Sequence, residues 1–170
     1  DVTVEEYIEM IRLKTSVLLA GALKIGAILG GASEDDAQLL YDFGVRMGLA
    51  FQLQDDYLDV YGDPAVFGKK IGGDILCNKK TYMLITALEK ADTQTRRELL
   101  DWIAASNYVP SSKIEAVTAI YNKVGIGEIC QQKIDQYYEE AKALLEKVSV
   151  EDALKQNLMD FVLKLMNRKL

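Results

Sequence analysis

Strand-like alternation of apolar and polar residues is scarce along this chain, whereas the capping signatures of helices recur at helical spacing. Proline, which interrupts helices, occurs only at Pro64 and Pro110. The pattern therefore predicts an all-α protein. We expect helices over approximately residues 3–29, 33–61, 76–91, 94–105, 113–123, 126–148 and 150–168.

Four pairs of residues predict where helices begin, because a hydroxyl at the first position can accept a hydrogen bond from the backbone N–H three residues later. Gly30-Gly31 ends the first helix, and Gly62-Asp63-Pro64 ends the second. A loop rich in glycine and lysine follows over residues 67–73. The four capping pairs are Thr3 and Glu6, Ser33 and Asp36, Ser112 and Glu115, and Ser149 and Asp152.

The longest apolar stretch runs from Thr15 to Ala32 and is apolar on all sides from Val17 onward. It contains Lys24 and four glycines, so it falls short of the ~20 clean apolar residues that a membrane span needs. The stretch predicts a buried helix of a folded domain.

The 170 residues, about half of them apolar, suit a single domain with its own core. The net charge of -6 argues against a nucleic-acid partner, which would require a basic face. Because the chain has no histidine and Cys77 and Cys130 form no CxxC pair, the usual zinc and haem sites and a Ser/His/Asp triad are excluded. Two isolated cysteines fit a reducing cytoplasm.

Three carboxylates lie close together near the end of the second predicted helix. Asp55 and Asp59 share one face at positions i and i+4, and Asp56 lies about 100° around the helix. Oxygen ligands without histidine or thiolate suit Mg²⁺ or Mn²⁺. Because Mg²⁺ usually takes one or two carboxylates and completes its shell with water and phosphates, the cluster predicts a phosphate-bearing ligand.

Taken alone, these carboxylates fit a solvated acidic face equally well. The same stripe continues backwards through Gln52, Gly48 and Gly44, however. A solvated face has no need of two glycines that each cost about 1 kcal/mol in a helix. The glycines therefore predict either a neighbouring helix at close range or room for a cavity.

Two lysine pairs follow the carboxylates, Lys69-Lys70 in the loop and Lys79-Lys80 near the start of the third predicted helix. With the backbone N–H groups and the positive end of that helix, they could cradle a diphosphate. We expect at most one lysine of each pair to face such a site, because a single lysine fits a surface charge equally well. Asp74 is expected to be a supporting acid or a helix cap.

Lys14 and Thr15 stand at the start of the apolar helix. A lysine in this position must either extend its ammonium to solvent or meet an anion. The neighbouring hydroxyl could also contact a phosphate, so the residues alone leave both alternatives open.

The acidic helix and the lysines form a set of short motifs, which are Phe51-Gln52, Asp55-Asp56, Asp59, Gly68-Lys69, Gly72-Gly73-Asp74 and Asn78-Lys79-Lys80-Thr81-Tyr82. Together they resemble the second aspartate-rich region of trans-prenyl diphosphate synthases. The resemblance extends upstream to Lys14-Thr15, and the remaining helices are compatible with it. Short-chain members, such as farnesyl and geranylgeranyl diphosphate synthases, are the nearest.

The resemblance implies the all-α isoprenoid synthase bundle and a Mg²⁺-dependent prenyltransferase that joins an allylic diphosphate to isopentenyl diphosphate. The implied metal ligands are Asp55 and Asp59, supported directly or through water by Asp56 and Asp74. Mn²⁺ could take the place of Mg²⁺.

The implied contacts to the allylic diphosphate are three lysines, Lys14, Lys69 and Lys79. Thr15 and Gln52 would add polar contacts. The apolar helix that follows Thr15 would line or support the cavity for the prenyl tail. Full-length members of the family are generally homodimers.

Nothing in these residues resembles the family's first aspartate-rich motif, the arginine pair beside it or its Gly-Lys-Arg segment, and the chain begins without methionine. We therefore expect the C-terminal portion of a longer enzyme, and we expect this chain alone to be inactive in condensation. Two alternatives stay open. One is a noncatalytic helical subunit or pseudoenzyme, and the other is a class I terpene cyclase.

Overall fold

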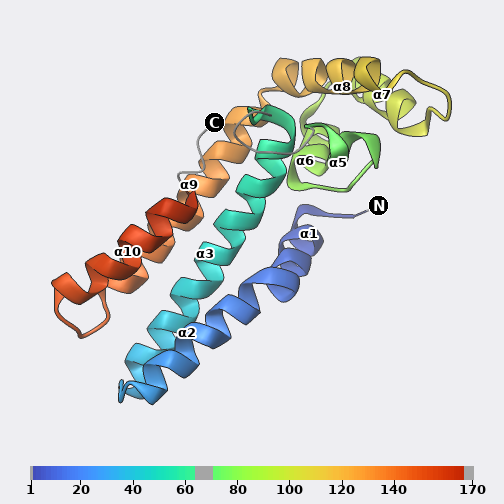
Figure 1. The fold of residues 1–170 in the computed structure, drawn as a ribbon. Coiled ribbons are helices and arrows are strands. Elements are labelled where there is room, and N and C mark those ends of the chain that lie inside the picture. The colour runs from blue at the N-terminus through green and yellow to red at the C-terminus, as the bar shows by residue number, and fades with distance from the viewer. Residues whose placement is uncertain (1, 64–70, 167–170) are drawn as a thin grey trace. The chain divides into compact units, whose positions relative to one another are not determined.

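The computed structural model describes residues 2–63 and 71–166, which form helices and no strand (Figure 1). The predicted all-α class is confirmed. The α-helices are α1 (Val4–Ile11), α2 (Val17–Leu29), α3 (Glu34–Tyr61), α5 (Gly73–Leu76), α6 (Tyr82–Lys90), α7 (Thr93–Ala104), α8 (Pro110–Val124), α9 (Ile126–Glu146) and α10 (Asp152–Met166), and a π-helix, η1, spans Arg12–Ser16.

The described residues divide into two compact units. Unit 1 contains Asp55–Gln131 and the N-terminal residues up to Tyr7, and unit 2 contains Ile8–Gln54 and the C-terminal segment from Gln132 onward. Helices α3 and α9 therefore contribute residues to both units. The single domain expected from chain length stays a prediction. In the parts of the chain that the structure describes, no helix combines the length and the apolar character of a membrane span.

The core of unit 2 forms where apolar residues recur at helical spacing. Phe43 and Met47 lie four residues apart on α3, so they share one face of that helix. They pack against α9 and α10, as the neighbouring ribbons in Figure 1 indicate. The buried residues of this core are Phe43, Met47, Ala141, Leu145, Val148 and Val162.

The two glycines of the acidic stripe mark a close approach of helices within unit 2. A Cβ atom added at Gly44 would lie 2.7 Å from the Cα atom of Ala20, and one added at Gly48 would lie 2.6 Å from the Cα atom of Ser16. Backbone atoms at that distance leave no room for a side chain. Of the two sequence-based alternatives, the neighbouring helix is therefore confirmed.

The first predicted helix is interrupted by a π-helical segment. Residues 3–29 were expected to form one helix, whereas the structure has α1, then η1 over Arg12–Ser16, then α2. A π-helical turn inserts an extra residue into the helix and is often found at functional sites. Lys14 and Thr15 lie within this segment.

The apolar helix α2 is only partly buried, so the prediction of a buried helix is wrong for one of its faces. Leu18 and Leu29 are 78% and 82% exposed, and Ile25 is also exposed. The opposite side is buried, with Ala20 at 0% exposure. A contiguous apolar face of this kind is unusual on a monomeric protein surface.

Two of the four predicted capping pairs are confirmed and two are wrong. Thr3 and Glu6 exchange hydrogen bonds between side chain and backbone, at 2.8 and 3.2 Å, and the Ser33 hydroxyl accepts the Asp36 N–H at 3.1 Å. Helix α8 starts at Pro110, ahead of Ser112, because proline suits the first helical turn. Ser149 does not cap α10 but donates its hydroxyl and its backbone N–H to Asp36.

The third predicted helix starts at the wrong place. Residues 76–91 contain the end of α5, a turn and α6. Asn78 has a positive φ of 50°, which ends α5, and the Thr81 hydroxyl then accepts the Leu84 N–H and caps α6. The predicted loop before α5 lies largely outside the described residues.

Candidate functional site

The three carboxylates of the acidic helix lie at the C-terminal end of α3, in unit 1. Asp56 points inward and is only 2% exposed, whereas Asp55 and Asp59 are half-buried. Neighbouring positions on a helix face different directions, so a single turn can present both a buried and an accessible carboxylate. The three acids therefore differ in how far solvent or a ligand can reach them.

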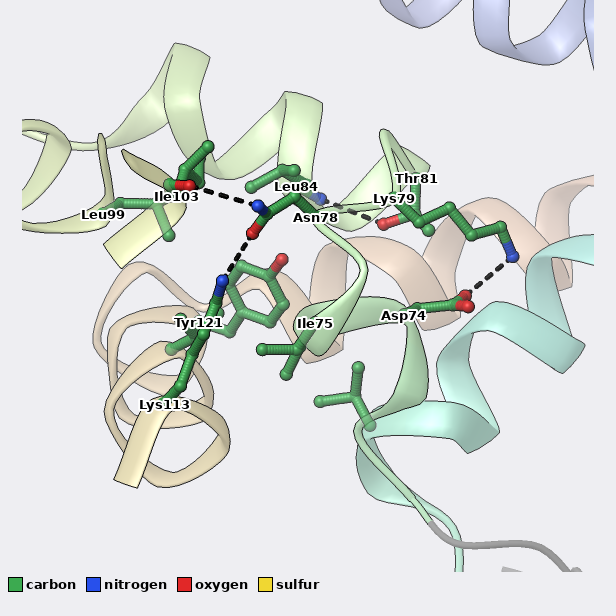
Figure 2. Close-up of a pocket in the computed structure, with 12 residues that line it drawn as sticks. Asp74, Ile75, Asn78, Lys79, Thr81, Leu84, Leu99, Ile103, Lys113 and Tyr121 are labelled. Atoms are coloured by element: carbon green, nitrogen blue, oxygen red, sulfur yellow. Dashed lines mark hydrogen bonds and ion pairs between the residues drawn. The ribbon is translucent and has the colours of Figure 1, made fainter. Parts of the chain in front are cut away.

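Lys79 connects two of the predicted acidic residues. Its ammonium lies 2.8 Å from Asp56 Oδ1 and 2.7 Å from Asp74 Oδ2. The Lys79 side chain extends from the turn after α5 toward Asp74, as Figure 2 shows. This geometry places a cation directly on the acidic cluster that the sequence predicts.

Tyr7 also binds Asp56. The ring of Tyr7 is buried, and its hydroxyl donates a hydrogen bond to Asp56 Oδ2. One oxygen of Asp56 therefore accepts from Tyr7, while the other accepts from Lys79. Two donors of this kind compensate the cost of burying the carboxylate.

Asp59 acts as a cap for the short helix α5. Its Oδ2 atom accepts the backbone N–H of Asp74 at 2.8 Å, and its Oδ1 atom would lie 3.3 Å from a Cβ atom built at Gly73. Gly72 has a φ of 85°, in the left-handed region that favours glycine. The Gly72-Gly73-Asp74 motif therefore brings the backbone close to Asp59.

The charges of Lys79 and Asp74 depend on one another. Partial burial lowers the pKa of Lys79, but the hydrogen bonds to Asp56 and Asp74 outweigh this effect and raise the pKa above its usual value. Partial burial raises the pKa of Asp74, and the hydrogen bond to Lys79 opposes that rise. Lys79 is therefore a permanent cation at neutral pH.

The structure brings only some of the predicted site residues together. Lys79, Asp56, Asp59 and Asp74 interact within unit 1. Lys69 lies outside the described residues. Among the residues that are described, no three acids or thiols gather closely enough to hold a metal ion by themselves.

The remaining predicted contacts belong to unit 2. Lys14 is exposed on η1, and the Thr15 hydroxyl donates to Gln52 Oε1 at 3.3 Å. Thr15 and Gln52, which were expected to contact the same diphosphate, are therefore hydrogen-bonded to each other.

Sequence reasoning missed two residues that shape the site, Tyr7 and Asn78. Tyr7 carried no signal, because its hydroxyl reaches Asp56 across 49 positions of the chain. Asn78 was part of a recognised motif but had no assigned role. Asparagine tolerates the left-handed region better than most residues, so an asparagine between two short helical segments could have indicated the turn.

The chain matches the family model described as polyprenyl synthetase over residues 1–124. The short chain isoprenyl diphosphate synthase of Methanothermobacter thermautotrophicus is 39% identical to it over 166 residues. The match covers 96% of this chain and 50% of that protein, so the chain spans about half the length of this curated relative.

Solved structures give the same assignment. The crystal structure of a geranylgeranyl pyrophosphate synthase has a TM-score of 0.91 and 42% identity, and the match covers 100% of this chain and 53% of that chain. The geranylgeranyl pyrophosphate synthase from Corynebacterium glutamicum, complexed with isoprenyl diphosphate and magnesium, has a TM-score of 0.87 and 29% identity, with 99% and 48% covered. The predicted isoprenoid synthase fold is confirmed, and the chain belongs to the polyprenyl synthetase family.

Proposed function

We propose that this chain supplies one part of the active site of a short-chain prenyl diphosphate synthase. In this reaction the bond between C1 and the diphosphate oxygen of an allylic diphosphate breaks, and its electron pair leaves with pyrophosphate. The double bond of isopentenyl diphosphate then forms a carbon–carbon bond to C1. Loss of a proton gives an allylic diphosphate that is longer by one five-carbon unit.

The observation that carries this proposal is the position of Lys79. Its ammonium is held by Asp56 and Asp74, its pKa is raised, and its side chain is 39% exposed. The exposed part of this positioned ammonium can therefore contact a diphosphate once a divalent cation offsets the carboxylates around it. Preorganised positive charge stabilises the leaving group as its negative charge develops.

The oxygen donors of α3 fit a hard divalent cation. Asp55 and Asp59 are half-buried carboxylates on one face of the helix, whereas Asp56 is buried and already receives two donors. We therefore assign Asp55 and Asp59 as the ligands of Mg²⁺ or Mn²⁺, with Asp74 in support. Such an ion would neutralise part of the diphosphate charge.

Four further residues match contacts of the allylic diphosphate in the family. They are Lys14, Thr15, Gln52 and Lys69. We expect this chain alone to be inactive and the full-length form to be a cytoplasmic homodimer. The exposed apolar face of α2 supports the idea that further protein surface covers this helix in the active enzyme.

Activity can be tested in a chimera in which this chain replaces the matching half of the Methanothermobacter thermautotrophicus relative. We expect the chimera to elongate geranyl diphosphate only when isopentenyl diphosphate and Mg²⁺ are both present, with products identified by mass spectrometry. The intact relative is the positive control, and this chain alone is expected to give no product.

Matched variants connect this assay to the site. Lys79→Met in the chimera is expected to lower kcat by roughly 10²–10³, as for loss of a preorganised donor. Lys80→Met removes the exposed neighbouring charge and should leave kcat within about a factor of two, since isolated surface charges contribute little. Products formed without isopentenyl diphosphate would instead support a cyclase, and a folded chimera without any product would support a noncatalytic role.

A further inference from the structure

Lys113 on α8 is a buried lysine that the reaction described above does not use. It is 1% exposed, and its ammonium donates to the Asn78 side-chain oxygen at 2.7 Å. The same ammonium lies 4.4 Å from the centre of the Tyr108 ring. In Figure 2 the Lys113 side chain points at Asn78.

The partners of Lys113 among the described residues are both uncharged, an amide oxygen and an aromatic ring. Burying an ammonium is costly, and only hydrogen bonds or similar contacts within the protein offset that cost. The pocket beside it has a volume of only about 10 Å³, too small for a substrate. If Lys113 has a role, it acts through Asn78, the residue to which it donates a hydrogen bond.

Asn78 forms the turn that ends α5. With a φ of 50°, it occupies the left-handed position of a Schellman motif, in which the Asn78 N–H donates to Ile75 and the Lys79 N–H donates to the Asp74 carbonyl. The side-chain amide of Asn78 is also fixed, since its Nδ2 atom donates to the Ile103 carbonyl at 3.1 Å. Lys113 donates to the oxygen of that amide, Asn78 Oδ1.

The turn determines where Lys79 starts. The Lys79 backbone N–H is bound within the motif, and the side chain then reaches Asp56 and Asp74. Without a donor at its oxygen, the Asn78 side chain would be held only through Ile103, and the turn would depend on its backbone hydrogen bonds alone. The direction of the Lys79 side chain would then be less well defined.

We propose that Lys113 is a positioning residue of the diphosphate site, because it fixes the Asn78 turn from which Lys79 extends its ammonium to Asp56 and Asp74. This inference rests on the proposed function, in which Lys79 binds the diphosphate. Lys113 itself lies buried behind the turn and contacts no substrate.

Titration of this chain with inorganic pyrophosphate and Mg²⁺, followed by calorimetry, tests the proposal. Lys113→Met fills the same space without a donor and is expected to weaken binding roughly tenfold. Its urea midpoint should fall modestly, because the Asn78 oxygen loses its donor, while an unchanged far-UV circular dichroism spectrum shows that the variant is folded. Asn78→Gly keeps the left-handed turn but removes the amide, and should weaken binding similarly. Lys123→Met, on the same helix, removes a lysine that bonds Thr95 and should leave the affinity unchanged.

A double variant separates positioning from direct binding. If Lys113 acts through Lys79, then Lys113→Met should have no further effect on binding in a Lys79→Met background. Independent, additive losses would overturn the proposal. If Lys79→Met weakens binding but Lys113→Met does not, only this inference fails, whereas unchanged binding in Lys79→Met contradicts the proposed function.

The NMR signal of the Lys79 ammonium reports the position of this group without any ligand. In the parent chain this group holds two carboxylates and should give a resolved, slowly exchanging resonance, assigned by its loss in Lys79→Met. In Lys113→Met and Asn78→Gly we expect that resonance to shift and broaden, while it stays unchanged in Lys123→Met. An unaltered Lys79 signal in Lys113→Met would overturn the proposal even if pyrophosphate did not bind.

Discussion

Gly48 on α3 lies directly against Ser16 on η1, where an added Cβ would come within 2.6 Å of the Ser16 Cα atom. We predict that Gly48→Ala lowers the free energy of unfolding by about 1–3 kcal/mol, because one of the two backbones must move to admit the methyl group. Urea denaturation followed by circular dichroism measures this change.

A glycine in open space provides the matched control. A Cβ atom at Gly26 in α2 meets no atom within 4 Å. Gly26→Ala should therefore raise the free energy of unfolding by about 0.5–1 kcal/mol through helix propensity alone. Equal effects of the two substitutions would contradict the close approach of α3 and η1.

The two cysteines are predicted to differ in reactivity. Cys130 on α9 is fully buried, and this burial, with a smaller effect of Asp56, raises the pKa of its thiol to about 12. Cys77, after α5, is exposed. Because the thiolate is the reactive form, iodoacetamide should modify Cys77 alone in the native chain and both cysteines in urea. Intact-mass spectrometry counts the adducts, and rapid labelling of native Cys130 would contradict its burial.

The pairing of Asp36 with Ser149 predicts a dependence of stability on pH. Hydrogen bonds from the Ser149 hydroxyl, and from its backbone N–H at 2.8 Å, lower the pKa of Asp36 in the folded chain. A group whose folded pKa is lowered stabilises the fold above its unfolded pKa of about 4, and this contribution is lost as the pH falls through the folded value.

Asp36→Asn should therefore lower the urea midpoint at neutral pH, and its difference from the parent chain should shrink as the pH falls below about 4. Asp35→Asn, at the exposed neighbouring position, controls for the change in net charge. If the urea midpoints of the parent chain and Asp36→Asn differ by the same amount across the whole pH range, then ionised Asp36 does not stabilise the fold.

Local signals were sufficient to predict most of the helices. Thr3 and Glu6 cap the first helix within three positions of each other, so their interaction could be recognised without knowledge of the fold. The turn at Asn78 was missed because its signal is a single asparagine in a chain whose helical pattern continues on both sides. Ser149 satisfies the capping pattern, yet its hydroxyl bonds to Asp36, 113 positions away.

In the candidate site, too, features set by neighbouring residues could be predicted from the sequence, whereas features set by residues distant in sequence could not. Asp55, Asp56 and Asp59 could be recognised as a cluster because helical spacing alone brings them together. Their separate roles could not be predicted, because Asp56 is distinguished from its neighbour by Tyr7 and Lys79, which lie far from it in sequence. Lys113 was not recognised at all, since its effect passes through the backbone of a turn.

Tyr7→Phe tests whether the buried hydroxyl is needed by the acidic cluster. The change removes the donor to Asp56, which is 2% exposed, and leaves that oxygen with one partner fewer in a buried environment. We expect the free energy of unfolding to fall by about 1–3 kcal/mol, the usual cost of an unsatisfied buried acceptor, as measured by urea denaturation. Tyr61→Phe is the control, because its hydroxyl bonds Asn122 at 3.0 Å on the exposed surface and should contribute less than about 0.5 kcal/mol. Similar decreases in the free energy of unfolding in both variants would show that the Tyr7 hydrogen bond stabilises the fold no more than an exposed one.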